Sequence, residues 1–141
     1  MLTTILQASE NFCIHQMCLS HVVSNTMPQK KSLIVYIDIN THTGQKHRVY
    51  IAADSNFIQK VAKLFLEEDE SDEETLRDMA LETANLIVGS AKVIAEEENS
   101  NAYTIDTPHF EKIDIFDFAY DQINVLQIEE DSLIIAIKEI D

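Results

Sequence analysis

The longest periodic segment of the chain reads SDEETLRDMALETANLIVGSAKVIAEE, from Ser71 to Glu97. Its apolar residues recur at intervals of three and four, which is the spacing of an amphipathic helix. Ser71 and Glu74 have the S-x-x-E spacing of a capping box, and Asp72 and Glu73 add negative charge where a helix dipole favours it. The sequence therefore predicts a helix from near Asp72 to about Glu97, roughly 38 Å long at 1.5 Å per residue.

The same period separates a core face of this helix from an exposed face. The residues expected in the core are Leu76, Met79, Ala80, Thr83, Ala84, Ile87, Val88, Ala91 and Ile94. The stripe on the opposite side consists of Asp78, Glu82, Asn85, Gly89, Lys92 and Glu96. Glycine inside a helix costs ~1 kcal/mol relative to alanine. An exposed Gly89 therefore indicates a place where another backbone or side chain approaches closely.

The chain before the long helix predicts a first helix, a β-hairpin and a second helix. Apolar residues at helical intervals predict a helix from Thr3 to Leu19. Alternating residues from Leu33 to Ile39 predict a strand, and a short turn leads to a returning strand from Arg48 to Ala52. Asp54 or Ser55 is expected to cap the next helix. The residues expected on the core face of that helix are Phe57, Ile58, Val61, Leu64 and Phe65.

The chain after the long helix predicts a turn followed by strands. Asn99, Ser100 and Asn101 have turn chemistry. The predicted strands are Tyr103–Asp106, Lys112–Phe116, Ile123–Ile128 and Leu133–Ile137. The order of helix, hairpin, two helices and several strands implies an α+β fold, with a largely antiparallel sheet packed with long helices.

The composition limits the kinds of protein and partner. The 141 residues, with 45% hydrophobic content and no shift in composition, predict one domain over residues 1–141. A formal net charge of −15 argues against a nucleic-acid partner, because a phosphate backbone is repelled by a surface of the same sign. The chain has no apolar run of ~18 residues and no secretory signal pattern, so we expect no membrane insertion and a cytoplasmic location.

Two cysteines and two histidines lie close together in the first predicted helix and just after it. Cys13 and Cys18 are five residues apart, which turns their side chains ~140° away from each other on a helix and argues against a disulfide. With His15 and His21 they lack the C-x-x-C spacing that aims two thiolates at one zinc ion. We therefore expect packing of a helix face here and assign no metal.

Three residues of the exposed stripe lie at fixed distances in the sequence from one another and from a proline. Asp78 begins the pattern D-x3-E-x2-N, which ends at Asn85, and after a further 22 residues comes Pro108, one of only two prolines. This pattern resembles the signature of the chemotaxis phosphatases CheC, CheX and FliY. The segment LETANLIVG, from Leu81 to Gly89, is similar to the family's E-L-A-N-x-x-x-G helix. The family's glycine shortly after the proline is missing here.

The resemblance implies an activity, a partner and a role for each residue of the pair. Family members hydrolyse the aspartyl phosphate of CheY, a receiver domain, which terminates the chemotaxis signal. By this resemblance Asn85 positions the attacking water, and Glu82 docks to the receiver's active-site lysine. A neutral amide suits the first task because a carboxylate would add negative charge beside the phosphoryl group. The Mg²⁺ that the reaction needs is expected in the receiver, so no cofactor or metal is assigned to this chain.

The resemblance also concerns the neighbours of the pair and the oligomeric state. Asp78, Gly89, Lys92 and Pro108 are candidate partner-docking residues. Taken alone, an exposed Asp78 or Lys92 is also ordinary solvated surface. CheC-type members carry two copies of the site, whereas the first predicted helix offers no second E-x-x-N spacing. A single site resembles CheX, whose members are typically homodimers.

Two other functions are compatible with the same residues. One is a non-catalytic adaptor that binds receiver domains without hydrolysing the phosphoryl group. The other is a flagellar switch scaffold in which the motif is vestigial. The decay of phosphorylated CheY separates an enzyme from an adaptor, and the solution mass together with a pull-down separates a free enzyme from a scaffold.

Overall fold

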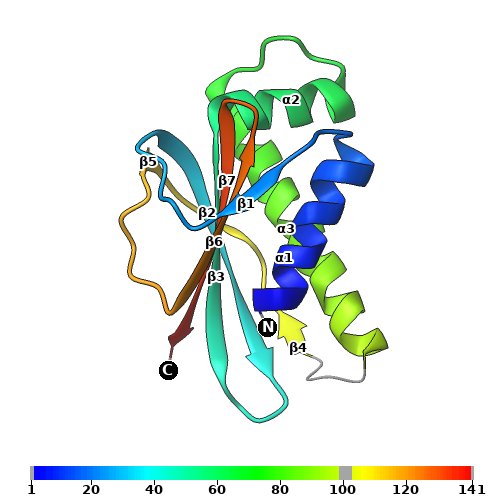
Figure 1. The fold of residues 1–141 in the computed structure, drawn as a ribbon, viewed down its shortest axis with the longest axis vertical. Helices are drawn as coiled ribbons and strands as arrows, with labels where there is room; N and C mark the ends of the chain where they lie inside the picture. Colours follow the sequence, from blue (N-terminus) through cyan, green and yellow to red (C-terminus); the bar gives the residue numbers. More distant parts are fainter. Residues whose placement is uncertain (1, 99–102, 141) are drawn as a thin grey trace.

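The helices pack together on one side of a β-sheet in a computed structural model that describes residues 2–98 and 103–140 (Figure 1). The helices are α1 (Leu2–Asn11), which continues into a π-helical turn (Phe12–Gln16), α2 (Ser55–Leu66) and α3 (Glu73–Glu97). The strands are β1 (Val22–Ser24), β2 (Lys31–Thr41), β3 (Lys46–Asp54), β4 (Tyr103–Ile105), β5 (His109–Ile115), β6 (Gln122–Ile128) and β7 (Asp131–Ile140). The turn predicted at Asn99–Asn101 lies outside the described residues. No helix in the described part of the chain is long and apolar enough to cross a membrane.

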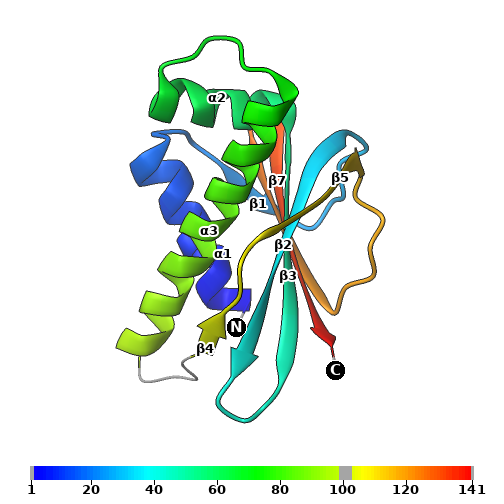
Figure 2. The same ribbon diagram turned by 180° about the vertical axis from the view of Figure 1, so that it is seen from behind.

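Every strand pairing in the sheet is antiparallel. The strand order is β1-β6-β7-β3-β2-β4, and β5 also pairs with β2. The predicted hairpin is β2 and β3, and Gly44 in its turn adopts a φ of 85° that glycine tolerates. Figure 2 shows α3 lying alongside α1, with α2 across the end at which α3 begins. The predicted α+β fold with an antiparallel sheet and packed helices is confirmed.

The first predicted helix extends too far. The α-helix ends at Asn11 and gives way to the π-helical turn, after which the chain is no longer helical. The N–H of Leu19 donates to the carbonyl of Cys13 at 2.8 Å, a wider ring than an α-helix contains. Cys18 has a φ of 57°, a left-handed conformation that commonly ends helices. The short strand β1 follows, and it was not predicted from the sequence.

The long helix begins with a cap different from the predicted one. The capping box headed by Ser71 is wrong, because the Ser71 hydroxyl donates to the Glu68 carboxylate at 2.7 Å. Asp72 is the N-cap instead, and its side chain accepts from the N–H of Thr75 at 2.8 Å. This hydrogen bond lowers the pKa of Asp72. The helix starts at Glu73, one residue from the predicted position.

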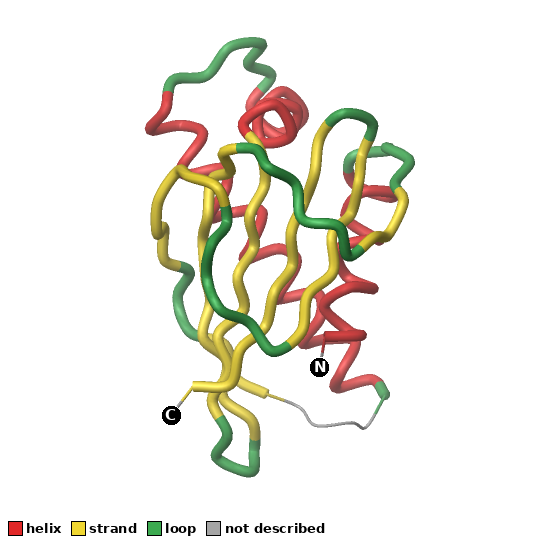
Figure 3. Tube along the Cα trace, turned by 60° about the vertical axis from the view of Figure 1, so that its left-hand side comes forward, coloured by secondary structure: helices red, strands yellow, loops and turns green. Residues whose placement is uncertain are grey.

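The sheet is buried on both faces. The residues of β2 that face the helices in the main core are Leu33, Val35, Ile37 and Ile39. The opposite face has its own buried cluster, which consists of Ile34, Tyr50, Ala52, Phe116, Val125, Ile134 and Ala136. Loops cross this face in Figure 3, and the rings of Phe116 and Phe118 lie 5.5 and 4.8 Å from the ring of Tyr50. The predicted strand is confirmed, but its burial is nearly continuous because the loop between β5 and β6 covers the second face.

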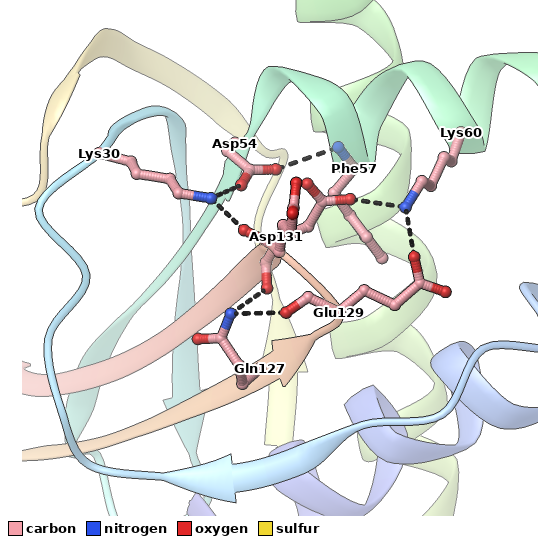
Figure 4. A network of polar contacts seen from close by, with 8 residues as sticks. Lys30, Asp54, Phe57, Lys60, Gln127, Glu129 and Asp131 are labelled. Carbon is pink, nitrogen blue, oxygen red and sulfur yellow. Dashed lines mark hydrogen bonds and ion pairs between the residues drawn. The ribbon is translucent and has the colours of Figure 1, made fainter.

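A polar network joins the start of α2 to the turn between β6 and β7 (Figure 4). Asp54 caps α2, as predicted, by accepting from the N–H of Phe57 at 3.1 Å, and it lies 3.5 Å from the Lys30 ammonium. Burial raises the pKa of the Asp54 carboxyl. Across the same turn, Lys60 Nζ lies 2.8 Å from Asp131, whose side chain is only 3% exposed. These contacts hold the first half of α2 against the sheet.

Lys60→Ala is expected to lower the free energy of unfolding by about 2–3 kcal/mol, because it leaves the Asp131 carboxylate buried without its cation. This value lies below the usual ~3–5 kcal/mol for a broken buried ion pair, since Lys60 is 39% exposed and water partly replaces it. Lys63→Ala on the same helix is the control, because its partner Asp69 is 83% exposed and such pairs contribute less than ~1 kcal/mol. Urea denaturation measures both variants, and equal losses would contradict the structural role of the Lys60 contact.

Candidate active site

The stripe predicted on the long helix lies on the outer side of α3. Asp78, Glu82, Asn85 and Glu96 are exposed, whereas Gly89 and Lys92 are half-buried. The opposite side packs against α1, α2 and β2. Its buried residues are Met79, Ala80, Thr83, Ala84, Ile87, Val88, Ala91 and Ala95. Leu76 and Ile94 were also predicted in the core but are half-buried, since each lies at the margin of the packed face.

Glu82 and Asn85 form the centre of the stripe. Residues three apart on an α-helix are neighbours, with Cβ atoms about 5–6 Å from each other. Within residues 2–98 and 103–140, neither side chain forms a hydrogen bond or ion pair. Thr83 lies between them in sequence but is buried, and its hydroxyl donates to the Met79 carbonyl at 2.7 Å. The packed side of α3 therefore fixes the rotation that leaves Glu82 and Asn85 free to contact another molecule.

Gly89 leaves open space on the same stripe. A Cβ atom added at this position would meet no atom within 4 Å. The glycine is therefore not required by packing within the described part of the chain. The close approach predicted at Gly89 stays a prediction about a second molecule.

Pro108 lies in the short connection between β4 and β5, and both of these strands contact α3. The guanidinium of Arg77 stacks on the ring of Phe110 at 4.7 Å from its centroid, and Arg77 also pairs with Glu73 at 3.1 Å. These contacts were not predicted, and they bring the Pro108 connection toward the part of α3 that carries Asp78. Strand β5 begins directly after Pro108, and none of residues 103–115 has a positive φ. The described backbone at this connection therefore does not need the family's missing glycine.

The cysteines and histidines near the N-terminus are arranged as packing residues and surface residues. Cys13 is buried, and this burial raises the pKa of its thiol to about 12. Cys18 is exposed, and both thiols are free. His21 lies 2.7 Å from Glu10. Among the described residues, no group of three histidine, cysteine or acidic side chains is placed to hold a metal ion.

Phe65 departs from its predicted place in the core. It was assigned with Leu64 to the apolar face of α2, but the two side chains are 43% and 50% exposed. α2 ends at Leu66 and is followed by the C-cap Glu67, whose φ is 60°. The spacing of apolar residues shows which face of a helix is apolar. It does not show how far the neighbouring elements extend along that face. Phe65 consequently forms part of a surface beside α3.

Comparison with known proteins assigns the family. A family model described as Chemotaxis phosphatase CheX matches residues 34–121, which is more than half of the chain and includes the motif from Asp78 to Pro108. The chain therefore belongs to the CheX family of chemotaxis phosphatases. A comparison with curated protein sequences gives no match.

Solved structures of low sequence identity share the fold over nearly the whole chain. Chemotaxis protein CheX from Vibrio vulnificus has a TM-score of 0.77 at 16% identity, and the match covers 97% of this chain and 95% of that one. CheX from Desulfovibrio desulfuricans has a TM-score of 0.75 at 13% identity, with 98% and 97% covered. The CheX chain matched in the CheX-CheY-BeF3-Mg²⁺ complex from Borrelia burgdorferi has a TM-score of 0.67 at 15% identity, with 98% and 97% covered.

Proposed function

We propose that this protein is an enzyme that accelerates hydrolysis of the aspartyl phosphate on a CheY-type receiver domain. The observation that carries the proposal is the exposure of Glu82 and Asn85 on one face of a helix that is fixed by packing on its other side. Membership of the CheX family supports it. A further support is that the similar protein from Borrelia burgdorferi forms a complex with CheY, BeF3 and Mg²⁺.

In this proposal Asn85 controls the attacking water. Its amide oxygen accepts a hydrogen bond from a water molecule and holds it in line with the phosphorus–oxygen bond to the aspartyl group. The water oxygen bonds to phosphorus as that bond breaks, the aspartyl carboxylate leaves with the electron pair, and inorganic phosphate is released. Positioning supplies most of the catalysis, because a loose phosphoryl-transfer transition state needs little covalent assistance.

Glu82 has the complementary task of docking. Its carboxylate accepts a charge-assisted hydrogen bond from the active-site lysine of the receiver, and this contact sets the register of the two proteins. Asp78, Lys92 and the Pro108 connection lie on or beside the same stripe and extend the contact area. The proposal places Mg²⁺ in the acidic pocket of the receiver, where it neutralises charge on the phosphoryl oxygens. The proposed working form is a cytoplasmic homodimer with one stripe on each chain, on the basis of the family alone.

The direct test is the decay of a phosphorylated CheY-type receiver in the presence of Mg²⁺. The receiver is labelled with phosphate, separated from the donor, and followed with and without catalytic amounts of the protein. Faster loss of the label at amounts of protein well below those of the receiver supports the enzyme. A receiver that binds but loses its label at its own rate identifies an adaptor. A receiver that neither binds nor decays faster contradicts the proposal for that partner.

Gly89→Ala is expected to affect stability and docking in opposite directions. Alanine at this helical position meets open space and stabilises the helix by about 0.5–1 kcal/mol, so the melting temperature rises. The added methyl group lies where the receiver approaches, so the affinity for the receiver falls. Gly44→Ala is the control: its φ of 85° makes alanine destabilising by roughly 1 kcal/mol, while docking stays intact. Unchanged affinity in Gly89→Ala would remove Gly89 from the docking surface.

A further inference from the structure

An apolar hollow with a volume of about 180 Å³ lies where the three helices meet. Its buried side is formed by Ala8 and Phe12, and its walls include Phe65 and Leu86. Its rim is polar and exposed, and consists of Asn11, His15, Gln16 and Ser90. The hollow is therefore formed by α1 and its π-helical turn, by the end of α2 and by the middle of α3. Figure 2 shows these helices converging.

The walls of this hollow are fixed by contacts deeper in the fold. The ring of Phe12 packs against the ring of Phe57 at 6.5 Å between centroids, which anchors the π-helical turn to the core. The segment after α2 is tied back by Gln59, whose side-chain oxygen accepts from the N–H of Ser71 at 2.9 Å. Phe65 nevertheless remains 43% exposed beside the hollow. A fixed apolar hollow with an exposed aromatic wall is a favourable place to bury an apolar group from outside.

The hollow borders the proposed catalytic stripe. Leu86 directly follows Asn85, and Ser90 directly follows Gly89, so these two lining residues are turned by about 100° around the helix from the stripe and form its flank. Any protein whose surface brings a phosphoryl group to Asn85 also extends over this side of α3. On the other flank of the stripe, nearer the start of α3, the guanidinium of Arg77 stacks on the ring of Phe110.

The size and chemistry of the hollow define its occupant. An engineered apolar cavity of ~150 Å³ binds benzene, so this volume fits one leucine, methionine or phenylalanine side chain. The stripe itself carries the carboxylates of Asp78 and Glu82, which attract a cation. The matching surface is therefore one that presents an apolar side chain beside a lysine.

We infer that the hollow between α1, α2 and α3 receives an apolar side chain of the phosphorylated receiver domain, beside the receiver's active-site lysine. The inference rests on the proposed function. It adds that an apolar side chain on the receiver increases the affinity of the complex and so helps to determine which receivers bind. The hollow contributes affinity, because its apolar walls take up an apolar side chain of the partner. Receivers with a charged side chain at the corresponding position lose this contact, since Phe12, Phe65 and Leu86 offer a charge no partner.

The test compares variants that change the hollow with one that does not. Phe65→Ala removes a wall, and Ser90→Phe fills the mouth from an exposed helical position. Each is expected to weaken binding to a CheY-type receiver activated with BeF3 and Mg²⁺ by about tenfold, as loss of a buried apolar contact predicts. Leu66→Ala is the matched control, because Leu66 is next to Phe65 and similarly exposed at 46%, but does not line the hollow. The loss is expected in the affinity, whereas Asn85→Ala reduces the decay rate.

The outcomes separate this inference from the proposed function. If the wild type accelerates receiver decay while Phe65→Ala and Ser90→Phe bind as tightly as it does, the inference is overturned and the enzyme stands. Equal weakening by Leu66→Ala also overturns it, because the contact is then not specific to the hollow. A change in the sedimentation mass of both hollow variants without a change in receiver affinity assigns the hollow to a second copy of the chain instead. If the wild type neither binds nor dephosphorylates receivers, both statements fail.

Discussion

Asn85→Ala is expected to reduce the acceleration of receiver dephosphorylation by at least ~10²-fold while leaving receiver binding nearly unchanged. The reason is that the amide acts on the water and makes its main contribution as the phosphoryl group is transferred. Alanine preserves the helix, because Asn85 is exposed and contributes no hydrogen bond within the described chain. The rate is measured as decay of a labelled receiver, and the affinity is measured separately with a receiver activated by BeF3.

Two further substitutions sharpen this result. Asn85→Asp keeps the shape of the side chain but adds a negative charge beside the phosphoryl group, so it is expected to lose acceleration as well. Asn56→Ala removes an exposed asparagine from the first turn of α2, away from the stripe, and is expected to behave as the wild type. If Asn85→Ala accelerates decay normally, the water-positioning role is wrong, whatever the family suggests.

The long helix was the most predictable part of the molecule because its signals are local. A 3.6-residue period over Glu73–Glu97 determines which side is buried, and an acidic residue at the N-terminus determines where it begins. The exposed position of Glu82 and Asn85 follows from this period alone. Strand boundaries were less accurate: β5 begins at His109 rather than Lys112, since pairing with β2 extends it. The sequence did not show which residue caps the helix, because Ser71 and Asp72 both suit that role. The hydrogen bond from the N–H of Thr75 to Asp72 identifies Asp72 as the cap.

The features that were missed depend on contacts between distant segments. β1 has three residues, two of them exposed valines, and exists because it pairs with β6. The second buried face of the sheet depends on Phe116 and Phe118, which lie in a loop. A sequence signal for it was present, because the runs LIVYI in β2 and LIIAI in β7 are nearly continuous, as in strands buried on both faces. The hollow joins residues from Ala8 to Ser90, and no local pattern marks such a convergence.

The site therefore divides into a part that sequence determines and a part that tertiary packing determines. The motif from Asp78 to Pro108 places the candidate catalytic pair, whereas the flanks of the stripe are set by Arg77 on Phe110 and by the three-helix hollow. Catalytic residues need a given spacing on a rigid element, which a motif records. Partner selection depends on surfaces assembled from several elements, which a motif does not record.

Glu82→Ala is expected to weaken the affinity for the activated receiver by about 10–100-fold and to lower the rate of dephosphorylation with it. Its carboxylate is proposed to pair with a lysine that becomes enclosed in the complex, and truncating one member of such a pair costs ~2 kcal/mol or more. Glu82→Gln retains a hydrogen-bond acceptor without the charge, so an intermediate loss is expected. The wild-type affinity should fall with added salt more steeply than that of Glu82→Ala, because the variant lacks the ionic contact.

Glu96→Ala distinguishes a local contact from a general effect of charge. Both substitutions remove one negative charge from a chain of net charge −15, and both positions are exposed on the same side of α3. They are separated by about 21 Å along the helix at 1.5 Å per residue. If long-range attraction between an acidic protein and a basic receiver surface dominated, the two variants would lose similar affinity, mainly through slower association. A specific Glu82–lysine contact instead predicts faster dissociation in Glu82→Ala alone, and a titration that finds its affinity unchanged would exclude the docking role.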